Sequence, residues 1–469
     1  MSHPVPTITI ETLFPALSKK NSDVVALIKI AHPAMTALKS SRTKLNVVFA
    51  IDVSGSMSGI LSNSAVAVAE PVVPAPVFPA QPGWPMPGRI DPFGPMLGVH
   101  RPQPFMPQMQ GRLEYKTKLD RVKAATIKAI AQLHEDDRFG IVTFDGQVRI
   151  VVESTLATAQ AKSAAIAKIN QLHAGSSTAL HDGWKSAAEM VCQNLDPKMV
   201  NRVLLLTDGE ATDGIRDAKT LAAHAGTMSE HGVTTSTFGV GDQYNEILLQ
   251  GMAESGDGRY YYLEGDANFE QMFAEEFQGM SRLYGSDVRL RVHAANTTTL
   301  EFHNDLPVTP QGWKLPNAVH EKVEYYLVTL KQSVVDQDAL NFMVAYDYKN
   351  DGAVHTVSVE HSIAVVSDKS FSLMKPNDVV GKKQLELETA RAKEKAMEAL
   401  DRGDYQASRG ILTASAMSIS ASAYAAAPEF LAQSARLETL MNVGDSGDST
   451  KLRKMASYDT YATRNNHSS

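Results

Sequence analysis

Hydrophobic and polar positions follow two alternating patterns over residues 45–283. Short runs of Val, Leu and Ile predict buried strands, and apolar residues spaced three and four apart predict amphipathic helices. The strands are expected at 45–51, 138–144, 148–152, 201–207, 234–241 and 259–264, and the helices at 118–135, 158–172, 180–195, 216–231, 244–255 and 267–283. This alternation predicts an α/β domain with a doubly wound, mostly parallel sheet covered by helices on both faces.

The flanking segments have different patterns. Residues 286–368 and the N-terminal arm alternate apolar and polar side chains, which predicts half-exposed antiparallel strands. Residues 382–440 return to helical spacing. We therefore expect the α/β domain to be inserted in a β-sandwich that is followed by a C-terminal helical region. The expected domains are 1–44 (N-terminal strands of the sandwich), 45–284 (α/β domain), 285–370 (β-sandwich), 380–441 (helical region) and 443–469 (a polar, disordered tail).

A proline-rich insertion interrupts the α/β pattern at about 60–115. Its prolines oppose both a helix and a central strand, so we expect a mainly extended or irregular loop. Two interpretations remain open. The segment is either a tolerated surface insertion or a lid or docking segment beside a functional site.

Composition narrows the classes of function. The net charge of −7 and the lack of a basic cluster argue against a general nucleic-acid binder. No apolar run reaches the roughly 18 residues of a membrane span, and the first residues lack the pattern of a secretory signal. The single Cys192 excludes a disulfide within the chain, and its helical context predicts a small core residue. These observations indicate a cytoplasmic protein.

The candidate chemistry begins in LNVVFAIDVSGSMSG, residues 45–59, where a predicted buried strand ends at Asp52. Ser54 and Ser56 follow at alternate positions, so their side chains can project to the same side, and Gly55 permits a tight bend. One carboxylate and two hydroxyl groups form an all-oxygen set, which hard divalent cations such as Mg²⁺ prefer. Three groups do not complete an octahedral shell, so further oxygens are expected at other strand ends.

Two further oxygen donors occur at such places. Thr178 lies in HAGSSTALHDG just before a predicted helix, and Asp208 follows the second buried strand in LLLTDGE. Thr212 and Asp213, a few residues beyond, are candidates for the rim of the site. An alternative is that these side chains only cap helices or turns.

In this order, these residues resemble the metal-ion-dependent adhesion site of the von Willebrand factor type A (VWA) family. That site has an Asp-x-Ser-x-Ser motif, a Thr and a distant Asp, and the matching residues here are Asp52, Ser54, Ser56, Thr178 and Asp208. The resemblance covers about 45–283 apart from the insertion, and it implies a Rossmann-like VWA fold. It also implies that the hydroxyl groups bind Mg²⁺ (or Mn²⁺ or Ca²⁺) directly, with Thr178 doing so in some states, and that the carboxylates act mostly through water.

A coordination shell of this kind keeps one position open, which implies a function. The open position would accept the Asp or Glu side chain of a partner protein. The resemblance therefore implies a metal-dependent protein–protein interaction module, and not an enzyme. More loosely, the whole chain resembles cytoplasmic bacterial-type VWA proteins. The resemblance implies AAA+ ATPases or other multi-protein assemblies as classes of partner. Neither a nucleic-acid partner nor a membrane span is expected.

Two other functions remain open. A metal-dependent hydrolase would need a positioned general base, but no H-E-x-x-H, G-x-S-x-G or G-x-x-x-x-G-K-[ST] motif occurs. A structural or assembly protein would leave the metal site unused.

Overall fold

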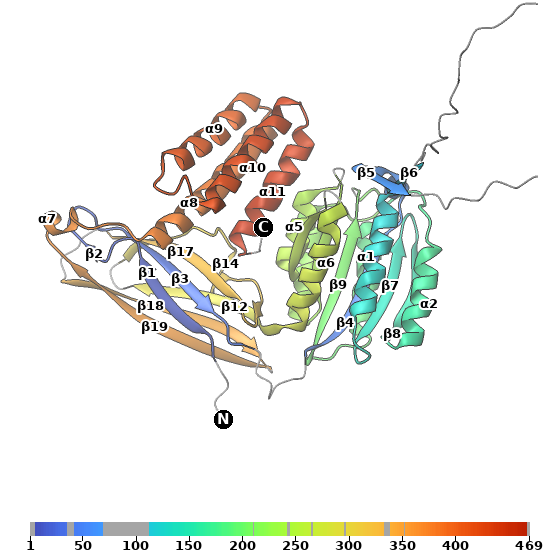
Figure 1. Cartoon of the computed structure of the whole chain (residues 1–469). Helices are drawn as coiled ribbons and strands as arrows, with labels where there is room; N and C mark the ends of the chain where they lie inside the picture. Colours follow the sequence, from blue (N-terminus) through green and yellow to red (C-terminus); the bar gives the residue numbers. More distant parts are fainter. Residues whose placement is uncertain are drawn as a thin grey trace, which may run out of the picture.

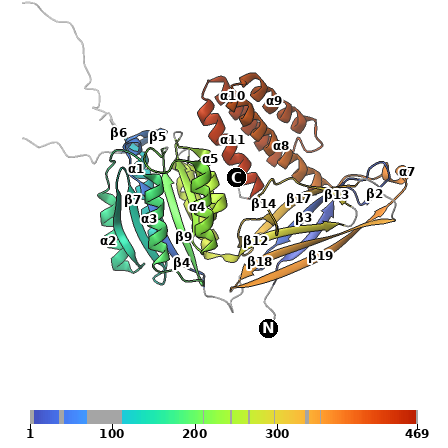
Figure 2. The same ribbon diagram turned by 180° about the vertical axis from the view of Figure 1, so that it is seen from behind.

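Three groups of elements make up the protein: an α/β domain, a pair of β-sheets and a group of C-terminal helices (Figures 1 and 2). The computed structural model describes residues 5–34, 42–68, 112–209, 211–241, 244–263, 266–294, 297–332, 338–350 and 352–466. None of the helices in this described part of the chain combines the length and apolarity that crossing a bilayer requires.

The α/β domain is built on a six-stranded sheet with the order β11-β10-β9-β4-β7-β8. All neighbouring strands are parallel except the edge strand β8, which pairs antiparallel with β7. The prediction of a mostly parallel sheet is therefore confirmed. The strands are β4 (Lys44–Asp52), β7 (Arg138–Phe144), β8 (Val148–Leu156), β9 (Met199–Thr207), β10 (Thr234–Val240) and β11 (Asp257–Leu263).

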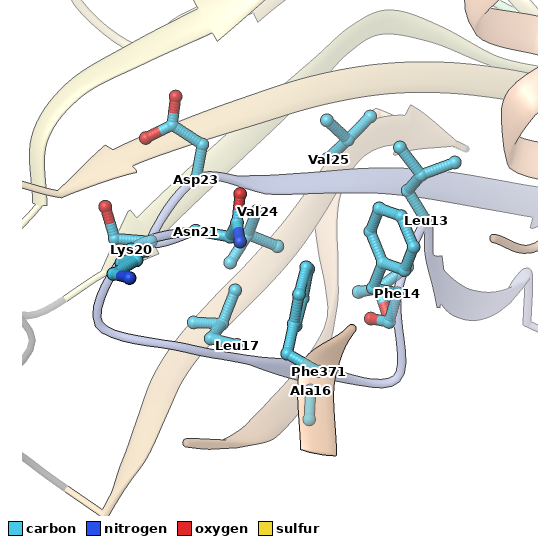
Figure 3. Close-up of a pocket in the computed structure, with 12 residues that line it drawn as sticks. Leu13, Phe14, Ala16, Leu17, Lys20, Asn21, Asp23, Val24, Val25 and Phe371 are labelled. Carbon is cyan, nitrogen blue, oxygen red and sulfur yellow. The ribbon is translucent and has the colours of Figure 1, made fainter. Parts of the chain in front are cut away.

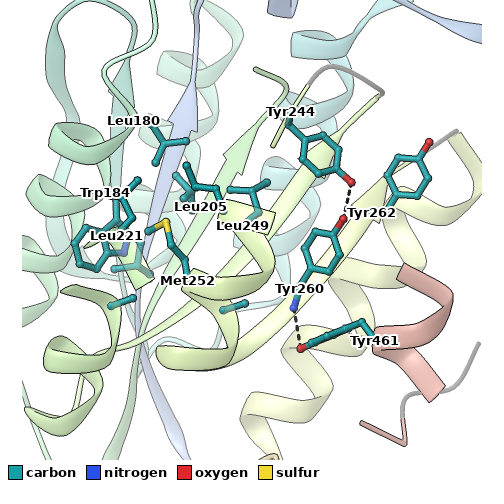
Figure 4. Close-up of a cluster of buried hydrophobic side chains, with 14 of the residues drawn as sticks. Leu180, Trp184, Leu205, Leu221, Tyr244, Leu249, Met252, Tyr260, Tyr262 and Tyr461 are labelled. Atoms are coloured by element: carbon teal, nitrogen blue, oxygen red, sulfur yellow. Dashed lines mark hydrogen bonds between the residues drawn. The ribbon is translucent and has the colours of Figure 1, made fainter. Parts of the chain in front are cut away.

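Helices cover both faces of this sheet, as the sequence pattern predicts. They are α1 (Lys118–Gln132), α2 (Ala159–Asn170), α3 (Leu180–Cys192), α4 (Ala218–Glu230), α5 (Glu246–Ser255) and α6 (Asp266–Ser281). Successive residues of β4 point to opposite faces, so Val47 joins the core with α1, α2 and α6. Val48 joins the core with α3, α4 and α5, where Trp184, Leu221 and Leu249 lie (Figure 4). Because β4 is buried on both faces, it is apolar without interruption from Val47 to Ile51.

Two further sheets share one hydrophobic core, and their strands pair antiparallel except for β2, which pairs parallel with β19. The four-stranded sheet contains β1 (Thr7–Thr12), β3 (Val24–Ala31), β17 (Val323–Gln332) and β13 (Thr297–Phe302). The second sheet contains β14 (Val308–Thr309), β15 (Gly312–Lys314), β12 (Leu283–Ala294), β18 (Ala339–Asn350), β19 (Ala353–Val365) and β2 (Ala16–Leu17), with β16 (Ala318–Val319) paired to β12. Ile28 and Tyr326 of the first sheet and Leu290 and Val344 of the second contribute to the shared core. Strands from both sides of the α/β domain thus pair in one sheet.

A pocket of about 240 Å³ lies at one end of these sheets (Figure 3). Phe14 and Phe371 form one wall, with their ring centroids 4.9 Å apart, and Lys20 and Asp23 lie at the polar side. Among the described residues, none of the five predicted metal ligands lines this pocket.

The C-terminal helices are α7 (Asp368–Phe371), α8 (Asp378–Asp401), α9 (Tyr405–Ala421), α10 (Pro428–Asp445) and α11 (Ser449–Arg464). They confirm a helical C-terminal region, but the prediction of a disordered tail at 443–469 is wrong for residues 443–466. Leu452, Met455 and Tyr461 of α11 are buried, and Tyr461 Oη accepts a hydrogen bond from Tyr260 N at 3.1 Å (Figure 4). The tail has a polar composition, but its apolar residues are buried because α11 packs against α8 and β11.

The proline-rich insertion is only partly described. Its ends form an antiparallel ladder between β5 (Ile60–Val68) and β6 (Arg112–Thr117), and the remainder lies outside the described residues. The choice between a tolerated insertion and a lid or docking segment is therefore not tested. Cys192 differs from expectation, because it is exposed at the C-terminal end of α3.

Candidate metal centre

The two predicted carboxylates meet at one edge of the central sheet. Asp52 ends β4, and Asp208 directly follows β9, the neighbouring parallel strand, with Ile51 paired to Leu206. Both carboxylates are completely buried, at 0 % exposure. The carboxyl ends of parallel strands share one edge, which is where α/β sheets bind their ligands.

The loop after β4 adds two hydroxyl groups. Ser54 N donates to Asp52 Oδ1 at 2.7 Å, Ser54 Oγ lies 3.0 Å from Ser56 Oγ, and Ser56 Oγ donates to Asp208 Oδ1 at 2.7 Å. Ser54 is the N-cap of the short helix η2 (Gly55–Ser58), but its side chain makes no capping hydrogen bond. The capping alternative therefore does not explain the Ser54 hydroxyl group, which points into the cluster.

Backbone contacts bring Thr178 to the same place. Gly55 N donates to Ser176 O at 2.9 Å, which joins the loop after β4 to the loop before α3. Thr212 Oγ1 accepts a hydrogen bond from Thr178 N at 2.8 Å, and Thr212 N donates to Thr178 O at 3.0 Å. Thr212, expected only at the rim, thus holds the backbone of Thr178.

Gly209 leaves space between two of the hydroxyl groups. A Cβ atom added there would lie 3.4 Å from Ser56 Oγ and 3.8 Å from Thr178 Oγ1. The structure therefore joins four of the predicted residues in one hydrogen-bonded chain and brings the fifth, Thr178, beside it.

Two residues of the cluster were not predicted as functional. Thr207 Oγ1 donates to Asp52 Oδ2 at 2.5 Å, and Lys118 Nζ donates to Asp208 Oδ2 at 2.6 Å. Thr207 directly precedes Asp208 in LLLTDGE, so its position at the strand end was a usable signal. Lys118 is 90 positions away from Asp208 in the chain and carries no comparable local signal.

The electrostatics of the cluster favour a cation. Burial raises the pKa of Asp52 to about 6, and the nearby charge of Asp208 adds to this rise, although hydrogen bonds from Thr207 and Ser54 oppose it. Two carboxylates that approach each other away from water are stabilised by positive charge. Lys118 supplies one such charge to Asp208 through an ammonium group whose side chain is 8 % exposed.

The donor set fits a hard divalent cation. Carboxylate and hydroxyl oxygens from three loops converge, and the site contains no sulfur or imidazole donor among the residues just described. Within the described ranges, no cluster of three or more His, Cys, Asp or Glu side chains could hold a metal ion. The centre proposed here is of another kind, because it combines two carboxylates with hydroxyl groups. The space beside Gly209 lies next to two of these oxygens.

The sheet order and helix layers define a doubly wound α/β domain with a cluster of oxygen ligands at its carboxyl edge. Residues 115–275 match the family model described as the von Willebrand factor type A domain. The chain therefore contains a VWA domain. The matched residues include Thr178 and Asp208 and begin after the Asp-x-Ser-x-Ser segment.

Two curated relatives are similar over part of the chain. The protein sll0103 of Synechocystis sp., described as uncharacterized, is 32% identical over 179 residues, which are 38% of this chain and 41% of that protein. YfbK of Escherichia coli, also described as uncharacterized, is 29% identical over 189 residues, which are 40% of this chain and 32% of that protein. The chain thus aligns with less than half of either relative.

Solved structures resemble the fold of nearly the whole chain. A von Willebrand factor type A structure from Catenulispora acidiphila has a TM-score of 0.63 at 17% identity and covers 98% of this chain and 96% of its own. The ArnB paralog VWA2 from Sulfolobus acidocaldarius has a TM-score of 0.53 at 12% identity, and the match covers 97% of this chain and 98% of that protein. At these identities the likeness concerns the fold alone.

Proposed function

We propose that this protein is a metal-dependent protein-interaction module that captures an acidic side chain of a partner through a divalent cation. One observation carries the proposal: Asp52, Ser54, Ser56 and Asp208 form a hydrogen-bonded cluster at the carboxyl edge of the sheet, with Thr178 beside it. The VWA domain supports this class of function, because domains of this family are generally metal-dependent interaction modules.

Each residue has a role in this proposal. The hydroxyl groups of Ser54, Ser56 and Thr178 would hold the ion directly, and Asp52 and Asp208 would act mostly through water. Bound there, Mg²⁺, Mn²⁺ or Ca²⁺ supplies a concentrated positive charge that attracts a carboxylate. Neutral hydroxyl ligands leave most of that charge unbalanced, so an Asp or Glu of a partner gains more from the remaining position than a neutral group does.

A metal titration tests the centre itself. Calorimetric titration with MnCl₂ and MgCl₂ is expected to show one site, which is lost in Ser54→Ala and Ser56→Ala. Ser58→Ala is the matched control, because Ser58 lies in the same short helix but its exposed hydroxyl group donates to the backbone oxygen of Gly55 at 2.7 Å. Absence of ion binding by the unsubstituted protein, or equal loss in Ser58→Ala, would contradict the proposed centre.

A capture experiment tests the interaction. The immobilised protein is mixed with native extract in MgCl₂ or in EDTA, and bound proteins are compared with those bound by the Ser56→Ala variant. A genuine partner is lost with both treatments and is released when its own contacting Asp or Glu is replaced by Asn or Gln. A partner retained in EDTA uses another surface.

We infer a non-enzymatic protein of the cytoplasm, with an AAA+ ATPase or another multi-protein assembly as the class of partner. Turnover of ester, phosphate or peptide substrates that disappears in Asp52→Ala would instead favour a hydrolase. Identical partner recovery with and without the two serines would favour a structural protein with an unused site.

A further inference from the structure

Lys118 is fixed firmly at the start of α1. Thr117 caps this helix, because its side chain accepts a hydrogen bond from Asp120 N while the Asp120 carboxylate accepts one from Thr117 N. Lys118 N also donates to Gly59 O at 2.9 Å, which ties the helix to the end of η2. The start of α1 is therefore attached to the same loop that carries the two serines.

The side chain of Lys118 crosses from this anchor into the metal centre. Its ammonium group lies 2.6 Å from Asp208 Oδ2, while Asp208 Oδ1 accepts the hydrogen bond from Ser56. The Asp208 side chain is 0 % exposed and that of Lys118 is 8 % exposed, so water screens this ion pair only weakly. Both oxygens of Asp208 are thus engaged by side chains of the chain itself.

This arrangement has a consequence for any divalent ion at the centre. Asp52 receives hydrogen bonds from Ser54 N and Thr207 Oγ1, which are neutral donors, so Lys118 is the cationic partner in the described cluster. A divalent ion beside Asp208 would gain less attraction from a carboxylate that is already paired, and it would be repelled by the ammonium group. The buried ammonium group in turn stabilises the carboxylate pair when no ion is bound.

We propose that Lys118 is an internal counter-ion that competes with the divalent cation for Asp208 and lowers the affinity of the centre for the ion. This inference rests on the proposed metal-dependent function. Lys118 is a positioning and tuning residue, and it is not itself a ligand of the ion. The centre is thereby stable without metal and releases its ion readily.

The experiment compares metal affinity in four variants of the full chain by calorimetry with MnCl₂ and MgCl₂. Lys118→Met and Lys118→Gln remove the charge, and both are expected to bind the ion about tenfold tighter or more. Lys118→Arg keeps the charge and is expected to bind like the unsubstituted protein. Lys123→Met is the matched control on the same helix, since Lys123 Nζ makes an exposed contact to Asn170 O at 3.3 Å.

Thermal unfolding provides a second measurement that does not depend on partner capture. In EDTA, Lys118→Met is expected to unfold at a lower temperature than the unsubstituted protein, and saturating MnCl₂ is expected to remove this difference. If Lys118→Met does not fold without metal, the comparison is made with Lys118→Gln, because the amide of Gln can still donate a hydrogen bond to Asp208.

The outcomes separate this inference from the proposed function. Unchanged or weaker ion binding by both neutral variants, beside normal binding by the unsubstituted protein, overturns the role of Lys118 and leaves the metal centre intact. If only the neutral variants bind the ion, the inference holds and the proposed function of the natural chain fails. If none of the proteins binds the ion, both are wrong.

Discussion

Thr207→Val removes one hydroxyl group beneath the metal centre and keeps the shape of the side chain. Thr207 Oγ1 donates to Asp52 Oδ2 at 2.5 Å, and both residues are 0 % exposed. Valine leaves that carboxylate oxygen without its donor in a place that water does not reach. The substitution therefore measures how strongly the strand end holds the charge of Asp52.

The structure sets the expected size of the effect. A hydrogen bond to a charged group contributes about 1.5–3 kcal/mol, compared with about 1 kcal/mol for a neutral pair. We expect Thr207→Val to lower the free energy of local unfolding by about 2 kcal/mol, which is roughly a 30-fold change in the equilibrium constant. Thr237→Val is the matched control: Thr237 on β10 is equally buried, but its Oγ1 donates to the neutral Leu249 O at 2.8 Å.

Hydrogen–deuterium exchange in EDTA is a suitable assay, because it reports local opening of individual strands. It is performed at pH 8, where Asp52 is ionised, since its pKa is about 6. Amides of β9 in Thr207→Val should exchange about 30-fold faster than in the unsubstituted protein. The control should change exchange in β10 by roughly fivefold. If Thr207→Val accelerates exchange no more than the control does, the charge of Asp52 does not depend on this hydroxyl group.

Two further predictions concern buried ion pairs outside the metal centre. Lys454→Met should raise amide exchange in α11 about a hundredfold, because it breaks a buried ion pair of 3.0 Å with Glu246, a loss of about 3 kcal/mol. Glu324→Gln should make the dependence of unfolding on acid pH shallower. Burial opposes ionisation of Glu324, but Lys322 and His32 lower its pKa to about 2. The stability that the ionised carboxylate contributes is therefore complete above about pH 4.5 and is lost as the pH falls towards 2.

Each of these predictions has a contrary outcome. Unchanged exchange in α11 of Lys454→Met would mean that the packing of this helix against α8 and β11 holds it in place without the ion pair. An acid transition below pH 4.5 that is identical with and without Glu324 would mean that other carboxylates control unfolding there. Circular dichroism during an acid titration measures the acid unfolding of the unsubstituted protein and of Glu324→Gln.

Much of the α/β domain was predictable because its signals are local. A buried strand such as β4 needs apolar residues on both faces, and the helices need apolar residues at regular spacing, so each segment shows its own pattern. The same holds for Asp52, Ser54 and Ser56, which lie within five positions and share one loop. The structure of the C-terminal tail could not be predicted locally, because a helix of polar composition is stabilised by the surfaces against which its apolar residues are buried.

The parallel α/β architecture and the candidate ligands were predictable from the sequence alone, because periodicity and strand-end chemistry are properties of short segments. The surroundings of those ligands depend on the folded chain. Lys118 reaches Asp208 across 90 positions, and Lys454 reaches Glu246 across 208 positions. Contacts of this kind depend on where the folded backbone places two distant segments, and no short stretch of sequence contains that information.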